Sequence, residues 1–254
     1  MLVPYPDVLP QTRGRLASGA VSGSAQSGEP IGTGWPEIAG GPPVRLGHRT
    51  YELIKRRLVD GQYAAGERLP VEALRAELGV SKQPVMEALR RLSGDGLVEI
   101  IPQVGCQVTT YTADEVTDFF HFFSEIEASI AEVAAARRTA AQLARLAAVS
   151  DQIAMVAQDG DPQDRARHYR ILNREFHAVI HDMSHSRIMA EMSRRMWDLS
   201  DFLITTTAVS RPLHTVVDER HGDHERIRQA LIDQDGPTAR REMAGHIART
   251  IGPS

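Results

Sequence analysis

Hydrophobic residues in the first half of the chain recur at helical spacing in three short stretches. The first begins near Tyr51 and ends at Gly61. The second begins at Pro70, which we place in the first helical position, and ends at Gly79. The third follows Ser81, whose side chain is a preferred N-terminal cap. The pattern therefore predicts three helices joined by short turns.

Two runs rich in β-branched residues follow the third expected helix. They read LVEII and CQVT, and they flank a turn that contains Gln103 and Gly105. Such runs around a glycine-containing turn predict a β-hairpin. Three short helices followed by a hairpin are the layout of a winged helix-turn-helix, a module that reads duplex DNA, and the hairpin is its wing.

From residue 112 onward the hydrophobic pattern has a helical period throughout. Thr112 and Glu115 have the spacing of a capping box, and Pro162 and Pro237 stand at expected helix starts. Long helices with short connections predict antiparallel packing in a bundle. The predicted fold is mainly α: an N-terminal winged helix-turn-helix joined to a C-terminal all-α helical bundle. The expected bundle helices span residues 112–138, 139–158, 162–183, 185–207, 214–234 and 237–251.

These patterns divide the chain into three parts. Residues 1–44 are rich in Gly, Ser and Pro and have no lasting apolar period. We expect this segment to be disordered, because it cannot bury enough surface to offset its chain entropy. Residues 45–110 form the expected DNA-binding domain, and residues 111–254 form the expected helical domain.

The composition is that of a globular protein, with 42% hydrophobic and 24% charged residues among 254. No apolar run approaches the roughly 18 residues of a membrane helix, and the N-terminus lacks the basic and apolar regions of a secretory signal. The single cysteine, Cys106, excludes an internal disulfide framework. We therefore expect a cytoplasmic protein without membrane association.

Charge is divided unevenly along the chain, although its net value is -4. Residues 45–110 carry ten Lys/Arg and eight Asp/Glu, and residues 1–44 carry two and three, which leaves about -5 for the remainder. A basic module joined to an acidic domain is the asymmetry expected of a DNA-binding module with a ligand domain.

The segment GERLPVEALRAELGVSKQPVMEALRRLSGDGLVEIIPQVGCQV resembles the N-terminal domain of the GntR family of bacterial transcription regulators. The resemblance implies a homodimer that binds a near-palindromic double-stranded DNA operator through two winged helices. A winged helix that contacts only protein is the alternative. The residues expected at DNA are Arg49, Arg68, Ser81, Lys82, Gln83, Met86, Arg90, Arg91, Gln103 and Gly105.

Four positions depart from the family pattern. Members commonly carry DNA-facing arginines where this chain has Ala73, Lys82 and Met86. They also often carry an arginine in the wing, at the position that Val104 occupies in this chain. Lys82 can contact phosphate but lacks the guanidinium group that makes two hydrogen bonds to guanine. Met86 offers only an apolar contact. We therefore expect base reading to shift toward two other residues of the third helix, while three arginines contact phosphate. The base-reading residues are Gln83 and Arg90, and the phosphate contacts are Arg49, Arg68 and Arg91.

Three histidines and an asparagine lie on inward faces of the expected bundle helices. Asn173 and His177 are four residues apart, so their side chains stack on one helix face. His224 has apolar residues three and seven positions later, and His246 lies between a methionine and an isoleucine. Taken singly, each histidine is more often a packed core residue than a metal ligand. Together the four side chains can converge inside a bundle.

The helical half resembles the FCD ligand-binding domain of the FadR-like GntR regulators. The resemblance rests on IEASIAEVAA, the pair FH, DHERIRQALIDQD and REMAGHI. Many members bind a divalent metal through one aspartate and three histidines at the positions of Asn173, His177, His224 and His246. The resemblance therefore implies an effector-binding and dimerisation domain with a metal site, for which Zn²⁺ or Ni²⁺ suits imidazole. It also implies a small-molecule effector, with a carboxylate as a candidate class.

Two departures bear on this site. Asn173 removes the formal negative charge of the usual aspartate, so metal should be held less tightly. Phe123 stands four residues before Glu127, where members often carry an arginine that receives an effector's carboxylate. We expect Phe123 and Glu127 to line an effector pocket that is more apolar on that side.

The expected function is that of a ligand-responsive transcription regulator, with repression as the expected mode, and not that of an enzyme. The alternative is a metal-dependent hydrolase that uses the histidine cluster. No catalytic motif such as H-E-x-x-H or G-x-S-x-G supports it. His181-Asp182 matches the dipeptide of metal phosphohydrolases, but that pair is common by chance. His221 and His224 could instead bind metal on a helix surface.

Overall fold

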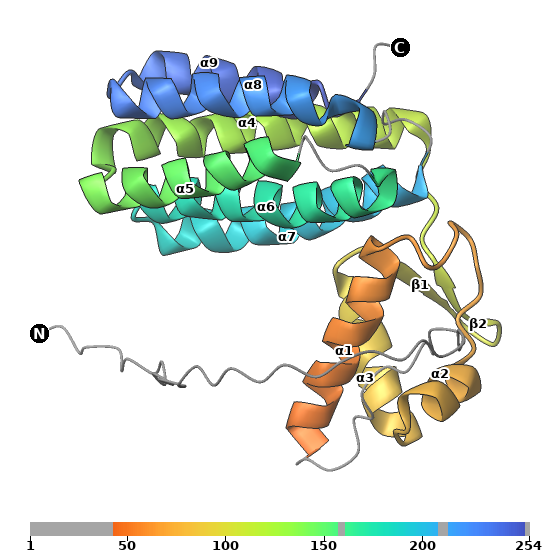
Figure 1. Cartoon of the computed structure of the whole chain (residues 1–254). Helices are drawn as coiled ribbons and strands as arrows, with labels where there is room; N and C mark the ends of the chain where they lie inside the picture. The colour runs from red at the N-terminus through yellow and green to blue at the C-terminus, as the bar shows by residue number, and fades with distance from the viewer. Residues whose placement is uncertain (1–42, 157–160, 208–212, 252–254) are drawn as a thin grey trace, which may run out of the picture. The chain divides into compact units, whose positions relative to one another are not determined.

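The structure is a computed structural model that describes residues 43–156, 161–207 and 213–251. It confirms the mainly α fold, with a winged helix-turn-helix followed by an all-helical bundle (Figure 1). The expected disordered segment lies outside the described residues, except for Pro43 and Val44, which belong to the first helix.

Three helices and a hairpin make up the winged module. Leucine, isoleucine and valine side chains from the three helices meet in its core, and each is at most 4% exposed. They include Ile54, Leu58, Leu74, Leu78, Val85, Leu89 and Leu92. The elements are α1 (Pro43–Val59), α2 (Val71–Leu78), α3 (Lys82–Gly94), β1 (Val98–Ile101) and β2 (Gly105–Val108).

Helix α1 begins at Pro43, well before Tyr51, where the apolar pattern predicted its start. Gly47 and polar residues interrupt the apolar period in this part of the helix, so periodicity alone missed it. Gly47 is buried against α3, where an added Cβ would lie 2.6 Å from Oε2 of Glu87. The glycine therefore lets the start of α1 approach α3 closely.

Two predicted helix starts differ in detail. Pro70 occupies the N-cap of α2 with an extended backbone, and the first helical residue is Val71. Ser81 stands at the N-cap of α3, as predicted, but its side chain makes no capping hydrogen bond. The Ser81 hydroxyl is exposed and so remains free for another acceptor.

The wing is the antiparallel pair β1–β2, with Val98 opposite Val108 and Ile101 opposite Gly105. Its turn places Gln103 at a positive φ of 65°, a conformation that non-glycine residues seldom adopt. Gly105, which the sequence suggested as part of the turn, is the first residue of β2.

The bundle consists of long helices joined by short connections, as predicted. The capping box of Thr112 and Glu115 is present at the start of its first helix. Helix α4 packs along α9, while α6 contacts α4, α5 and α8 (Figure 1). The elements are α4 (Ala113–Arg137), α5 (Ala140–Val156), α6 (Pro162–Met183), α7 (Arg187–Thr206), α8 (Leu213–Ile232) and α9 (Gly236–Ala248).

No helix in the part of the chain that the structure describes is long and apolar enough to cross a membrane.

Candidate functional site

Helix α3 presents the polar face that the sequence assigned to DNA. Lys82, Gln83 and Arg90 are exposed, while Met86 between them is half-buried. The apolar side of the helix is held in the core by Val85 and its neighbours, so the polar side faces outward. This is the arrangement of a recognition helix, in which side chains near the N-terminus reach base edges.

Met86 shares an apolar groove with the wing. Ile100 and Val104 line it from the hairpin, and Val104 is 53% exposed at the wing tip. Lys82 lies at the same groove, which Gln103 completes from the turn and Gly105 from the start of β2. The groove between helix and wing is therefore mostly apolar, where members of the resembled family would place arginines.

The three expected phosphate contacts differ in their surroundings. Arg49 and Arg68 are exposed. The Arg91 guanidinium lies 4.1 Å from the centroid of the Tyr51 ring, and its Nη1 is 3.5 Å from Nδ1 of His48. Arg91 therefore also joins α3 to α1 through a cation–π contact, which the spacing along one helix could not reveal.

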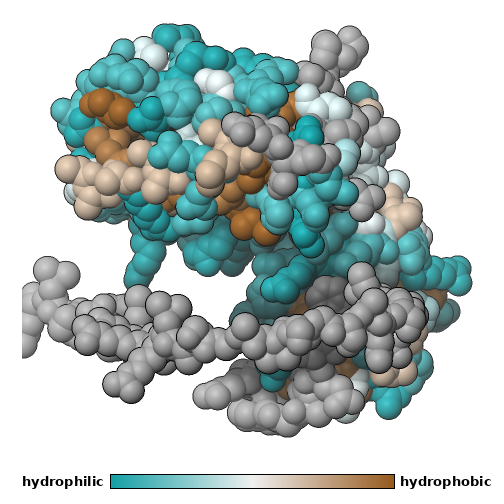
Figure 2. Space-filling view, in the orientation of Figure 1, coloured by the Kyte–Doolittle hydropathy of each residue, from teal (hydrophilic) through white to brown (hydrophobic). Residues whose placement is uncertain are grey.

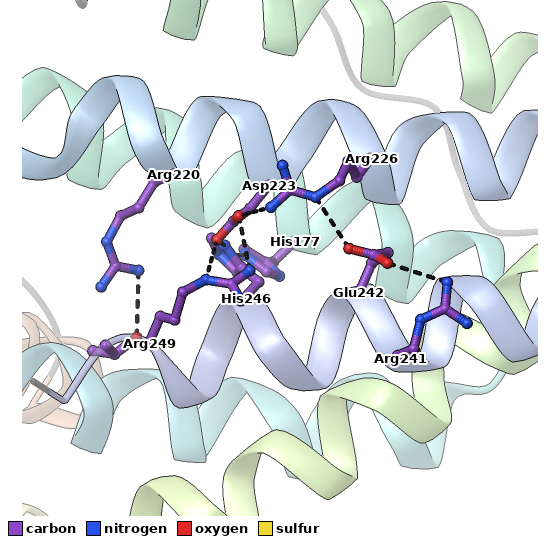
Figure 3. A network of polar contacts seen from close by, with 9 residues as sticks. His177, Arg220, Asp223, Arg226, Arg241, Glu242, His246 and Arg249 are labelled. Atoms are coloured by element: carbon purple, nitrogen blue, oxygen red, sulfur yellow. Dashed lines mark hydrogen bonds and ion pairs between the residues drawn. The ribbon is translucent and has the colours of Figure 1, made fainter. Parts of the chain in front are cut away.

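Three helices of the bundle bring the predicted histidines together. His177 on α6, His224 on α8 and His246 on α9 are each at most 1% exposed. One ligand nitrogen from each lies within 4.8 Å of the others, and the Nε2 atoms of His177 and His246 are 3.3 Å apart (Figure 3). We call these three residues the histidine cluster.

The cluster has the protonation state that metal binding requires. Burial lowers the pKa of His177, and it lowers the pKa of His224 and of His246 well below the ordinary value. Both ring nitrogens of His224 are buried and have no hydrogen-bond partner among the described residues. Buried polar atoms are normally paired, so a neutral imidazole with two unpaired nitrogens fits a metal ligand.

A carboxylate stands behind His246. Its Nδ1 lies 3.3 Å from Oδ2 of Asp223, which is itself 2% exposed. Arg249 donates to Asp223 from Nε at 3.0 Å, and Arg226 also contacts it (Figure 3). This carboxylate fixes the ring of His246 so that Nε2 faces the cluster, as metal-binding histidines commonly require.

A second carboxylate, that of Glu127, lies behind His177. Its Oε2 lies 3.5 Å from Nδ1 of His177 and 3.0 Å from Nε2 of His181, and the hydroxyl of Ser193 also donates to it. Although burial raises the pKa of Glu127, His181 and His177 hold it below its ordinary value. Glu127 is therefore a buried carboxylate hydrogen-bonded by His181 and Ser193, while Nδ1 of the neutral His177 ring lies near it without a hydrogen bond.

Asn173 is close to the cluster but has another partner. It is 8% exposed, and its Oδ1 accepts a hydrogen bond from the hydroxyl of Tyr169 at 3.1 Å. Asn173 and His246 line one small cavity of about 20 Å³, which is room for about one water molecule. Asn173 can therefore reach this space beside the histidines.

The expected effector-pocket residues do not line that cavity. Phe123 is fully buried: its ring stacks on that of Phe119 with centroids 5.5 Å apart and meets the Trp197 ring edge to face at 5.2 Å. Glu127 is bound by the side chains described above. The walls come instead from α6, α7, α8 and α9. Sequence reasoning missed the residues Tyr169, Ser200, Asp201, Arg220 and Thr250 among them.

The other histidine hypotheses have structural answers. His181 binds Glu127, which gives it a partner inside the bundle, while Asp182 is exposed and contacts Arg145. These two neighbours point to different surroundings and do not form one site. His221 is half-buried and does not belong to the histidine cluster.

A second hollow lies on the surface of the bundle. Figure 2 shows apolar side chains among hydrophilic ones on the face that carries α5 and α6. Met155 and Ile171, 65% and 59% exposed, line a groove there with Val156 and Leu172. None of the three clustered histidines lines this groove.

Comparison with known proteins places both halves in established families. The family described as bacterial regulatory proteins, gntR family, matches residues 46–108, and the FCD domain matches residues 118–249. The HTH-type transcriptional regulator YdhC of Bacillus subtilis is 24% identical over 199 residues, 78% of this chain and 85% of that protein. The Exu regulon transcriptional regulator of Escherichia coli is 26% identical over 228 residues, 82% of this chain and 84% of that protein.

The fold has solved relatives as well. The structure of E. coli McbR/YncC matches with a TM-score of 0.64 and 22% identity, over 80% of this chain and 93% of that one. The families and the named relatives are transcription regulators and not enzymes, so the hydrolase alternative finds no support. The chain belongs to the GntR family of transcription regulators and carries an FCD domain.

Proposed function

We propose that this regulator is a cytoplasmic homodimeric repressor whose DNA binding responds to a small effector and to a divalent metal ion in the bundle. The observation that carries the metal part is the histidine cluster, with its three neutral imidazoles and the unpaired nitrogens of His224. A related protein of E. coli that is 22% identical over 205 residues is named the HTH-type transcriptional repressor GlaR, which supports repression.

The DNA part rests on the exposed face of α3. Gln83 and Arg90 offer the amide and the guanidinium that read adenine and guanine in the major groove. A single short helix reads few base pairs, so specific binding calls for two copies. Two-fold symmetry of a homodimer then matches a near-palindromic operator with half-sites about one helical turn apart.

The metal part assigns a task to each residue. His177, His224 and His246 would hold the ion, and Asn173 would contribute its amide oxygen or hold a ligand beside it. When bound, the metal supplies a positive charge that attracts an anionic effector such as a carboxylate. Asp223 and Glu127 orient His246 and His177 from behind.

The switch requires that the effector distinguish two arrangements of the two DNA-reading modules. A ligand shifts such an equilibrium only by its differential affinity for the two states. To move a population from 1:99 to 99:1, it must bind one arrangement about 10⁴-fold more tightly than the other. A small effector reaches such a ratio when it contacts several helices at once, and the cluster joins α6, α8 and α9.

Metal analysis tests the proposal. The full chain, purified without chelator, is expected to contain about one Zn²⁺ or Ni²⁺ per protomer, and chelation is expected to lower its Tm by mass action. Added Zn²⁺ should restore the Tm of the wild type but not that of His224→Phe, which keeps an aromatic ring without nitrogens. A wild-type protein that carries no metal and whose Tm ignores Zn²⁺ and Ni²⁺ would remove the metal from the proposal.

The DNA part has a separate test. Selection of bound duplexes from a random pool should return an inverted repeat, and the protein should elute as a dimer in size-exclusion chromatography with light scattering. Recovery of a single asymmetric half-site by a monomer would contradict the dimer and the palindrome together.

A further inference from the structure

Arg220 is a buried cation without a carboxylate partner among the described residues. It is 8% exposed, and its Nη1 donates to the neutral hydroxyl of Thr250 at 3.3 Å (Figure 3). Its neighbours differ from it in this respect. Arg226 and Arg249 both contact Asp223. A guanidinium stays protonated at all relevant pH values, and an uncompensated charge is costly to bury.

The guanidinium belongs to the same cavity as the histidine cluster. Arg220 lies one helical turn before His224 on α8, so both side chains share a face of that helix. Arg220, Asn173 and His246 line the cavity of about 20 Å³ together.

The cavity contains one acidic wall residue, and that residue is already paired. Asp201 is 4% exposed, and its Oδ2 accepts from Nε of Arg174 at 2.7 Å. Asp223 is likewise held by Arg226 and Arg249. Glu127 behind His177 supplies one buried negative charge, so a dication at the histidines together with Arg220 would still leave a net positive charge there.

We propose that Arg220 is an anchor for an anionic ligand, and that this ligand is a small carboxylate bound between the guanidinium and the histidine cluster. This inference rests on the proposed function for the metal and names the residue on α8 that receives the effector's anionic group. A guanidinium matches a carboxylate with two parallel hydrogen bonds. The Tyr169 hydroxyl and the Asn173 amide give the cavity two neutral polar walls, and the carboxylate of Asp201 in the same lining is paired with Arg174.

The size of the cavity restricts the ligand. The cavity has space for about one water, so a carboxylate fits beside Arg220 only if wall side chains move aside, and a compact ligand requires the least movement. Short-chain carboxylates meet this requirement, whereas a bulky aromatic acid would have to displace Trp197 or Ile204 from the wall.

Acetate binding to the full chain tests the proposal. With saturating Zn²⁺, acetate is expected to raise the Tm of the wild type, and neutral acetamide is not. In Arg220→Met, the affinity for acetate obtained from the Tm shifts should fall by about tenfold or more. This is the loss typical of a charge-assisted hydrogen bond. Arg228→Met is the matched control on the same helix: this arginine pairs with Glu225 outside the cavity, and the response should remain.

A second readout separates an anchor from a structural arginine. Without ligand or metal, Arg220→Met should keep or raise the Tm, because it removes an uncompensated buried charge. A clear drop in the Tm of this variant, measured in chelator, would show a structural residue and overturn the proposal. Arg220→Lys keeps the positive charge but cannot donate two parallel hydrogen bonds to a carboxylate. It should therefore retain part of the Tm shift caused by acetate.

The two proposals fail differently. If Zn²⁺ does not change the Tm of the wild type, the proposed metal site is wrong. Acetate should still bind more weakly to Arg220→Met than to the wild type. If Zn²⁺ binds, and acetate raises the Tm of the wild type and of Arg220→Met equally, the metal stands and Arg220 is not the anchor.

Discussion

The Nε2 atoms of His177 and His246 lie 3.3 Å apart, although the two residues are 69 positions apart in the chain. Two nitrogens bound at about 2.0–2.1 Å to a tetrahedral zinc ion are about 3.4 Å apart. Each ring is also backed by a carboxylate, His177 by Glu127 and His246 by Asp223. The distance between the two Nε2 atoms and the carboxylate behind each ring both suit two imidazoles that bind one metal ion.

Replacing Asn173 by aspartate is expected to tighten metal binding by about tenfold or more, which corresponds to about 1.4 kcal/mol. A carboxylate oxygen is a better ligand for a dication than an amide oxygen, and Tyr169 can still donate to it. Competition with a coloured chelator measures the affinity. Equal affinity of Asn173→Asp and the wild type would place this side chain outside the metal site.

Asp223→Asn is expected to weaken metal binding by about 10- to 100-fold, because the amide holds the ring of His246 less well. Glu242→Gln is the matched control. Glu242 also pairs with Arg226, at 3.1 Å, but it does not contact the histidine cluster (Figure 3). If both variants lose affinity to the same degree, the arginine network as a whole matters, and not the contact with His246.

Arg90→Ala is expected to lower the ratio of operator binding to random-duplex binding, at a cost of about 1–3 kcal/mol in discrimination. Arg90 is exposed on the outer face of α3, where a base contact is possible. Titrations with both duplexes at one salt concentration measure the ratio. Equal losses on the two duplexes would make Arg90 a phosphate contact.

Arg91→Ala provides the comparison for Arg90. Because its guanidinium covers the Tyr51 ring, its loss is expected to reduce the free energy of unfolding by about 0.5–1 kcal/mol. Denaturant titration measures this effect, and the operator ratio should change less than in Arg90→Ala.

Cys106 is expected to resist alkylation in the folded protein. Burial raises the pKa of its thiol to about 11, and only the thiolate reacts. At pH 8.5 the folded thiol should react about 100-fold more slowly than an exposed one, and its rate should rise as the pH approaches 11. The chain unfolded in guanidinium chloride is the reference, and equal rates in both states would contradict the shift.

Local pattern predicted most of the fold. Thr112 and Glu115 form the predicted capping box, and helix ends marked by proline, such as Pro162, agree with the structure. The start of α1 was wrong because Gly47 interrupts the apolar period. That glycine is explained by a neighbour distant in sequence, Glu87, which pattern within one helix cannot identify.

The site was predictable only in part for the same reason. The inward positions of the three histidines followed from helical spacing, and the structure brings them together. Their partners did not follow, because the contact of Glu127 with His181 depends on how α4 and α6 pack. Arg220 was missed, although it lies on the face of His224, because an arginine is expected on the surface unless its burial is known.

The apolar groove between α3 and the wing also has a consequence for ionic strength. Each cation that neutralises a DNA phosphate releases counterions and steepens the fall of affinity with salt by about 0.9 in the logarithmic slope. The neutral side chains of Met86 and Val104, which line this groove, would release no counterions on DNA binding, and Lys82 is the one cation in the lining that would. The regulator should therefore hold its operator over a wider range of salt than a relative with arginines there, and gain less from non-specific attraction to the rest of the chromosome.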